Sequence, residues 1–212
     1  MTTTILAAVT GAFMLGDWWA TWAKRQNVRT VTKPAALLFL IVVAVAIEPF
    51  VYTIRTWMVI GLALSLIGDV FLLGDSKATF IGGLVSFLLG HVVYVVAMQQ
   101  APRSVPWTIV GLVLVAVAIG TVGRRIVSGV GASGNRELVP AVIAYLVVIS
   151  AMVVSAFGTA APWAIIGAGL FYASDATLAW NRFIEERRFG PLAVMVTYHL
   201  GQAGLVAWLV TG

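Results

Sequence analysis

The sequence contains no cysteine and few charged residues, and both absences narrow the possible functions. Without cysteine the chain can form no disulfide, no thiolate metal site and no cysteine nucleophile. Charged residues make up 10% of the 212 residues, whereas soluble domains carry about 25%. Hydrophobic residues make up 61%. This composition excludes a water-soluble fold and predicts a membrane protein.

Motifs for several reaction classes are missing as well. There is no GxSxG elbow and no P-loop, so serine hydrolase and nucleotide chemistry lack support. The two histidines form neither an HxxxH nor an HExxH pattern, which makes a zinc site a poor prediction. Basic residues exceed acidic ones by 13 to 8, but they are spread over short loops, as membrane topology requires. We therefore predict no metal, no cofactor, no nucleic acid and no protein partner.

Apolar stretches near 20 residues recur along the whole chain, and each matches the roughly 30 Å hydrocarbon core of a bilayer. Helices are the expected form, because a backbone in lipid must satisfy its own hydrogen bonds. The sequence predicts an all-α membrane bundle of eight transmembrane helices that forms a single integral membrane domain over residues 1–212. The expected helices are 4–23, 34–52, 56–74, 79–99, 106–123, 138–158, 161–181 and 189–210.

Prolines support these boundaries. Pro34, Pro106, Pro140 and Pro162 each fall in the first turn of an expected helix, where a missing N–H leaves no bond unmade. The first apolar stretch has no basic leader and no small-residue cleavage site, so we interpret it as a retained helix and not a signal peptide.

The basic residues divide unequally between the two sides that eight helices would give. Eleven lie on one side and two, Arg55 and Arg103, lie on the other. This positive-inside bias predicts that both termini lie outside the cytoplasm. The eleven are Lys24, Arg25, Arg29, Lys33, Lys77, Arg124, Arg125, Arg136, Arg182, Arg187 and Arg188.

Three aspartates fall inside expected helices, and each lies a few residues before the cytoplasmic end. An aspartate at a helix centre costs at least about 2.5 kcal/mol on insertion scales, so such residues usually face protein or water and serve a function. Asp69 and Asp175 are the predicted working pair. Asp17 lies closer to the interface, and we interpret it as solvated.

Other polar side chains in the expected helices could line the same inward-facing cavity. His91 and Tyr94 share one helix face, as do Tyr198 and Gln202 on another helix, and Tyr145 lies at a similar depth. Hydrogen bonds between helices are the alternative role for these residues. Lys33, predicted just before its helix, could meet a lipid phosphate or only the anionic leaflet.

Five short motifs occur in order along nearly the whole chain, and together they resemble the YhhN-like lysoplasmalogenase family. They are Thr32-Lys33-Pro34, Gly68-Asp69-x-x-Leu72, Gly90-His91-x-x-Tyr94, Ser174-Asp175-x-x-Leu178-Ala179-Trp180 with Phe183, and Tyr198-x-x-x-Gln202.

The resemblance implies an eight-helix membrane hydrolase that cleaves the vinyl ether bond of lysoplasmalogens to a fatty aldehyde and a glycerophospho-head-group. It implies a lysophospholipid substrate with membrane lipid as surroundings. Together with the distribution of basic residues, we expect a bacterial inner membrane protein whose site opens toward the cytoplasm. By motif it implies roles for these residues: Lys33, Asp69, His91, Tyr94, Ser174, Asp175, Tyr198 and Gln202.

The residues themselves suit this chemistry. Vinyl ether hydrolysis needs an acid to protonate carbon and an anion to stabilise the resulting cation. Burial and a nearby like charge can keep one of two carboxyl groups protonated at neutral pH, so two aspartates could supply both roles. Two alternatives remain open: a proton- or cation-coupled transporter that uses the aspartates, and a metal-dependent lipid hydrolase in which His91 joins them.

Overall fold

The computed structural model describes residues 2–211, and the regular structure within them is helical throughout. Residues 1 and 212, the ends of the predicted domain, lie outside the described residues. A π-helical turn, η1 (Ile119–Gly123), joins α5 to α6 without a break, and a 3-10 turn, η2 (Arg136–Leu138), leads into α7. The α-helices are α1 (Thr2–Trp22), α2 (Gln26–Ala46), α3 (Tyr52–Phe71), α4 (Lys77–Met98), α5 (Val105–Ala118), α6 (Arg124–Ala132), α7 (Val139–Gly158), α8 (Pro162–Phe183) and α9 (Gly190–Thr211).

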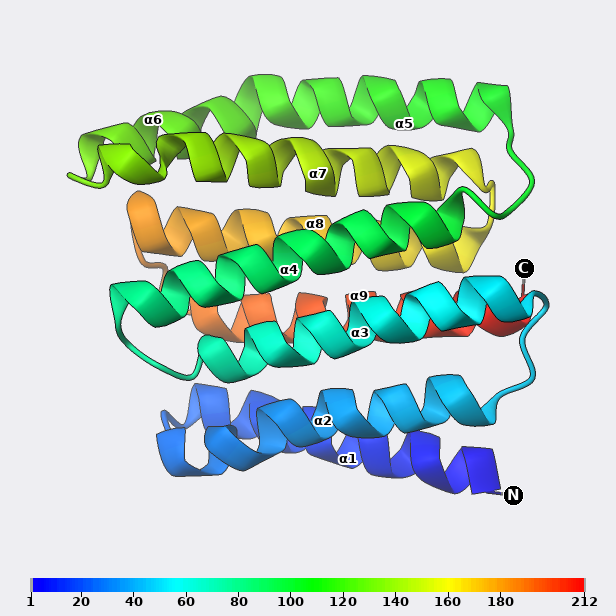
Figure 1. Ribbon diagram of the computed structural model, residues 1–212. Coiled ribbons are helices and arrows are strands. Elements are labelled where there is room, and N and C mark those ends of the chain that lie inside the picture. Colours follow the sequence, from blue (N-terminus) through cyan, green and yellow to red (C-terminus); the bar gives the residue numbers. More distant parts are fainter. Residues whose placement is uncertain (1, 212) are drawn as a thin grey trace.

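The helices run up and down as one bundle, and both ends of the chain lie at the same end of it (Figure 1). The opposite end carries the connections α1–α2, α3–α4, α6–α7 and α8–α9. Eight of the eleven basic residues of the sequence prediction lie in these connections or within one helical turn of them, whereas Lys33 lies two turns inside α2 and Arg124 and Arg125 begin α6. We call this the basic end, and we call the other the terminal end.

The helices have the length and apolarity of membrane spans. Within the described residues six stretches meet both requirements: α2, α3, α4, α5 with α6, η2 with α7, and α9. Their outer faces expose aliphatic side chains, for example Leu38, Val42 and Val45 on α2. The prediction of an all-helical integral membrane protein is therefore confirmed. Helices α1 and α8 are as long as the others, and each contains an aspartate.

Glycines let the last two helices touch through their backbones. A Cβ on Gly167 of α8 would lie 2.7 Å from the backbone N of Leu205 on α9, and a Cβ on Gly204 would lie 2.9 Å from the Cα of Gly167. Small residues at such a crossing allow close packing where lipid offers no hydrophobic driving force. This contact fixes α8, and therefore Asp175, against α9.

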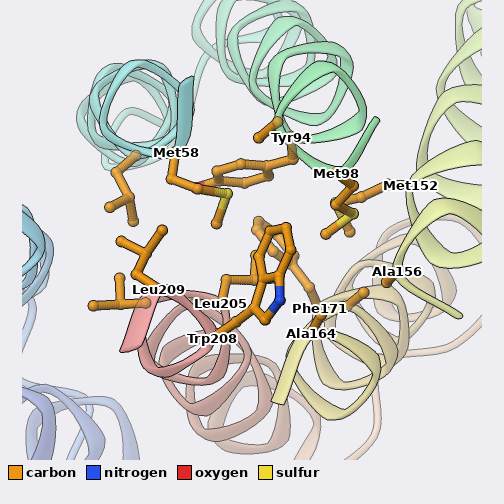
Figure 2. Packing of buried hydrophobic residues seen from close by; sticks show 14 of the residues in the cluster. Met58, Tyr94, Met98, Met152, Ala156, Ala164, Phe171, Leu205, Trp208 and Leu209 are labelled. Atoms are coloured by element: carbon orange, nitrogen blue, oxygen red, sulfur yellow. The ribbon is translucent and has the colours of Figure 1, made fainter. Parts of the chain in front are cut away.

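A hydrophobic core fills the centre of the bundle toward the terminal end. Figure 2 shows the side chains of Met58, Tyr94, Met98, Phe171 and Trp208 pointing toward one another. They belong to α3, α4, α8 and α9. All five side chains are fully buried. The interior is therefore packed solid at this end, and the polar residues of the predicted site lie nearer the basic end.

Helix α2 begins earlier than predicted. It starts at Gln26 and not at residue 34, so Pro34 lies inside the helix and the prediction for its first turn was wrong. The extra turns contact α1, since Thr32 donates a hydrogen bond to Asp17 at 3.2 Å and the Arg29 guanidinium lies 3.7 Å from the same carboxylate. The other three prolines stand at the first or second position of their helices, as predicted.

The fifth helix ends later than predicted. The helix was predicted to end at residue 123. In the structure α5 continues through η1 into α6, which ends at Ala132. Ile126 and Val130 of α6 are buried in a small cluster with Leu138 and Phe183. The two arginines at 124 and 125 interrupt the apolar stretch in the sequence, but both side chains are exposed and leave this packing undisturbed.

Candidate active site

A cavity of about 110 Å³ lies inside the bundle toward the basic end. Its wall is mostly apolar, with Leu84 and Phe87 from α4, Ile126 from α6 and Leu146 from α7 among its members. This volume can hold several water molecules or a short piece of a lipid. The polar residues in the wall are Lys33, Asp69, Tyr145, Tyr172, Ser174, Asp175 and Tyr198.

Asp69 is held by a cation and a hydroxyl group. The Lys33 Nζ lies 3.1 Å from Asp69 Oδ1, and both side chains are buried. Tyr198 donates a hydrogen bond of 2.7 Å to Asp69 Oδ2. A buried ion pair stabilises the charged form of both partners, because separating them would leave a lone charge out of water. The surroundings of Asp69 suit a carboxylate anion.

Asp175 has a different set of neighbours. Tyr145 donates a hydrogen bond to Asp175 Oδ2, and His91 Nε2 lies 3.8 Å from the same oxygen. The side chain of Asp175 is 15% exposed, compared with 1% for Asp69. Within residues 2–211 neither Lys nor Arg pairs with Asp175. These surroundings offer little to stabilise a negative charge and leave the carboxyl group in contact with the cavity.

Local packing orients both aspartates. Phe171 on α8, one turn before Asp175, packs at a steep angle against the rings of His91 and Tyr198, with ring centroids 4.7 Å and 5.3 Å apart. Ser174 donates a hydrogen bond of 3.0 Å to the Val194 carbonyl and so ties α8 to α9 beside Asp175. The serine lines the cavity, but its proton is already used by the backbone.

Three of the predicted supporting residues are not part of the cavity wall: Tyr94, Gln202 and His91, whose Nε2 lies 3.8 Å from Asp175 Oδ2. Tyr94 donates a hydrogen bond of 2.8 Å to Gln202, and both side chains are fully buried. Neither lines the cavity, so their predicted place in its wall was wrong. The Tyr94 ring packs over Gly61, where a Cβ would come within 2.3 Å of it. This pair joins α4 to α9 through the core, which is the alternative role that the sequence left open.

Two further positions need correction. Lys33 was predicted at the mouth of the site before its helix, but it lies inside α2 with 5% of its surface exposed and pairs with Asp69. Asp17 was interpreted as solvated, but it is fully buried and is held by Thr32 and Arg29. The cost of a carboxylate in a membrane span, applied to Asp17 as it was to Asp69, would have predicted this burial.

Sequence reasoning also left out His199. This residue is fully buried, and its Nδ1 accepts a hydrogen bond of 2.9 Å from Trp18 Nε1. This hydrogen bond joins α9 to α1. The same two helices are close to α2, which forms the ion pairs Arg29–Asp17 and Lys33–Asp69. A histidine directly after Tyr198 was the available signal, but a lone histidine does not show its partner.

The described residues show how the possible metal ligands are arranged. Within residues 2–211 no three His, Asp or Glu side chains come together as a possible metal site. The oxygen of Asp69 that a metal would need faces the Lys33 ammonium group instead. Carboxylates and hydroxyls around a mostly apolar space are better arranged for moving protons.

The family model named YhhN matches residues 28–209, and this stretch contains every candidate residue named above except Asp17. The chain belongs to the YhhN family. A human protein named lysoplasmalogenase TMEM86B is 31% identical over 144 residues, which are 67% of this chain and 58% of that protein. The chain thus covers less than two thirds of this relative. No solved structure matches the chain.

Proposed function

We propose that this YhhN-family protein is a membrane hydrolase that cleaves the vinyl ether bond of lysoplasmalogens. The observation that carries the proposal is one largely apolar cavity that holds two aspartates in opposite surroundings. The name of the human relative supports the same activity. A vinyl ether on a fatty chain needs an apolar space, an acid and an anion, and the cavity offers all three.

The two aspartates take different parts in this proposal. Asp175 has no ammonium or guanidinium partner in the described residues and contacts the cavity, so it carries the proton and acts as the general acid. Asp69 is paired with Lys33, so it is an anion at the start of the reaction. Environments that favour opposite protonation states are the usual basis of an acid and base pair.

The reaction then follows in two balanced steps. Asp175 gives its proton to the β-carbon of the vinyl ether, and the resulting oxocarbenium ion is stabilised by the Asp69 carboxylate. Asp69 takes a proton from water as the oxygen bonds to the cation and forms a hemiacetal. In the second step Asp175 accepts the hemiacetal hydroxyl proton while Asp69 returns its own to the departing glycerol oxygen. The products are a fatty aldehyde and a glycerophospho-head-group, and both aspartates are reset.

The hydroxyl groups hold the carboxyl groups in place for these steps. Tyr198 and Tyr145 each bind the Oδ2 of one aspartate. The other oxygen of Asp175 has no hydrogen-bond partner within the described residues and is the one that carries the transferable proton. His91, next to Asp175, limits the rotation of its carboxyl group.

The direct test is to incubate the purified protein with lysoplasmalogen and measure the aldehyde. We expect turnover that a chelator does not reduce. Loss of activity with chelator would favour the metal-dependent hydrolase. Absence of turnover with every vinyl ether lysolipid would remove the hydrolase proposal and favour a transporter.

The same proposal includes the topology. We place eight spans in a bacterial inner membrane as one domain, with the basic end and the cavity toward the cytoplasm. The shared position of the two termini in the bundle supports an even number of spans (Figure 1). A reporter that is active only in the cytoplasm should stay inactive when fused to the C-terminus, and a strong signal there would reverse the orientation.

A further inference from the structure

A second hollow lies at the basic end, between α6 and α8. Its volume is about 680 Å³, and its wall includes Arg124, Arg125 and Ser128 from α6 and Trp180 and Phe183 from α8. We call this the arginine groove. It belongs to neither the aspartate pair nor the hydrophobic core.

The arginine groove offers positive charge and hydrogen-bond donors. Arg124 and Arg125 are exposed, and within residues 2–211 neither forms an ion pair. Trp180 Nε1 is buried without a partner among the described residues, and the Arg187 guanidinium lies 5.0 Å from the Trp180 ring. The wall contains no acidic side chain. Such a set of donors suits an oxyanion, and guanidinium groups match phosphate in particular.

Two features of the backbone shape the arginine groove. The π-helical turn η1 ends directly before Arg124, and π-helical turns inside α-helices often occur at functional sites. At Gly129 of α6 a Cβ would lie 2.7 Å from Ile184 Cγ1, so only glycine lets the two walls approach this closely. The groove is therefore a built feature and not a gap at a frayed helix end.

The groove lies next to the cavity that holds the aspartates. Phe183 lines both spaces. Trp180 follows Asp175 by five residues on α8, which is roughly 7.5 Å along the helix axis. In a lysophospholipid only the glycerol backbone separates the phosphate from the ether oxygen. This axial separation is compatible with a phosphate in the groove and a vinyl ether in the cavity.

We infer that the arginine groove binds the phosphate of a lysophospholipid head group, and this inference rests on the proposed function. Lys33 cannot serve that purpose, because it is buried and paired with Asp69. The groove takes over the head-group role that the sequence prediction gave to Lys33. It sets the direction in which the substrate enters, with its polar end at the basic end and its chain in the bundle.

Binding can be measured without hydrolysis. The probe is a saturated-ether lysophosphoethanolamine, which has no vinyl group, and the comparison ligand is the alkylglycerol of equal chain length, which has no phosphate. The variant is Arg124→Gln with Arg125→Gln. We expect its affinity for the lysophospholipid to fall about tenfold, as for the loss of a charge-assisted hydrogen bond. Its affinity for the alkylglycerol should not change.

A control variant shows whether the lysophospholipid binds specifically in the arginine groove or is attracted by positive charge anywhere at the basic end. Arg136→Gln with Arg188→Gln removes the same charge at the same end and touches neither space. It should bind both ligands like the parent protein. Equal weakening in the control, equal weakening toward both ligands, or unchanged binding in the groove variant would each overturn the inference. Inorganic phosphate that binds the groove as tightly as the lipid would also overturn it, in favour of a free anion.

The activity assay tests the phosphate site and the hydrolase activity separately. With lysoplasmalogen the groove variant should show a KM about tenfold higher and a nearly unchanged kcat, because the phosphate contact is the same in ground and transition states. Turnover with an unchanged KM would overturn the groove and leave the hydrolase standing. If the lysophospholipid binds through its phosphate but lysoplasmalogen yields no aldehyde, the phosphate site is supported and the proposed hydrolase activity is contradicted.

Discussion

Asp69 and Asp175 are alike in sequence setting but differ in what surrounds them. Each lies near the basic end of its helix, lines the same cavity and accepts a hydrogen bond from a tyrosine. Asp69 has a buried ammonium partner, whereas Asp175 has a histidine 3.8 Å away. The difference shows how neighbours on other helices can give one residue type two chemical roles. The predictions below test that difference, and the last one tests whether the site ends at the cavity wall.

The largest effect is expected at Asp175. Asp175→Asn removes the transferable proton while keeping an oxygen for the Tyr145 hydrogen bond, so kcat should fall about a thousandfold, within the range for general acid catalysis. Thermal unfolding of the detergent-solubilised protein should be nearly unchanged. A well-folded variant with near-parental aldehyde release would show that Asp175 is not the acid.

Asp69→Asn should differ from Asp175→Asn by lowering stability as well as rate. We expect kcat to fall about a hundredfold with loss of the stabilising anion. The unfolding free energy should fall by about 3 kcal/mol, because Lys33 is left buried without its partner.

Adding Lys33→Met to Asp69→Asn gives the matched control. The double variant should regain most of the stability but none of the activity. Lys33→Met alone should lower kcat more than it raises KM, in contrast to a head-group contact. A pure rise in KM would restore the role that the sequence predicted for this lysine.

A smaller contrast is expected from the two tyrosines. Tyr198→Phe and Tyr145→Phe each remove one hydrogen bond to an aspartate oxygen, and each should lower kcat, by about threefold and about tenfold respectively. Because Asp69 keeps Lys33, while Asp175 has no comparable partner, Tyr145→Phe should have the larger effect. The reverse order in steady-state kinetics would contradict the assignment of the acid.

The smallest effect on catalysis is expected at Tyr94. Tyr94→Phe removes the hydrogen bond to Gln202 outside the cavity, so kcat should stay within about twofold and the unfolding free energy should fall by about 1 kcal/mol. A large loss of activity in a stable variant would bring Tyr94 back into the site.

Much of the candidate site could be predicted from the sequence. The cost of charge in a membrane span singled out Asp69 and Asp175, and helical depth grouped them with Tyr145 and Tyr198. The argument that residues three or four apart share a helix face added Tyr94 and Gln202, which bind each other instead. Depth along a helix follows from residue number, but the direction of a side chain depends on how the helix is rotated against its neighbours.

Composition, the spacing of apolar stretches and the positions of basic residues were enough to predict a helical membrane bundle and most of its helix boundaries. They are sufficient because bilayer thickness and backbone hydrogen bonding act on each segment separately. The tertiary structure alone decided that α2 begins before Pro34, that Lys33 pairs with Asp69, and that Arg29 is the cation beside Asp17. Each of these features depends on contacts between helices. The packing of the helices determines which charged side chains come within a few ångströms of each other.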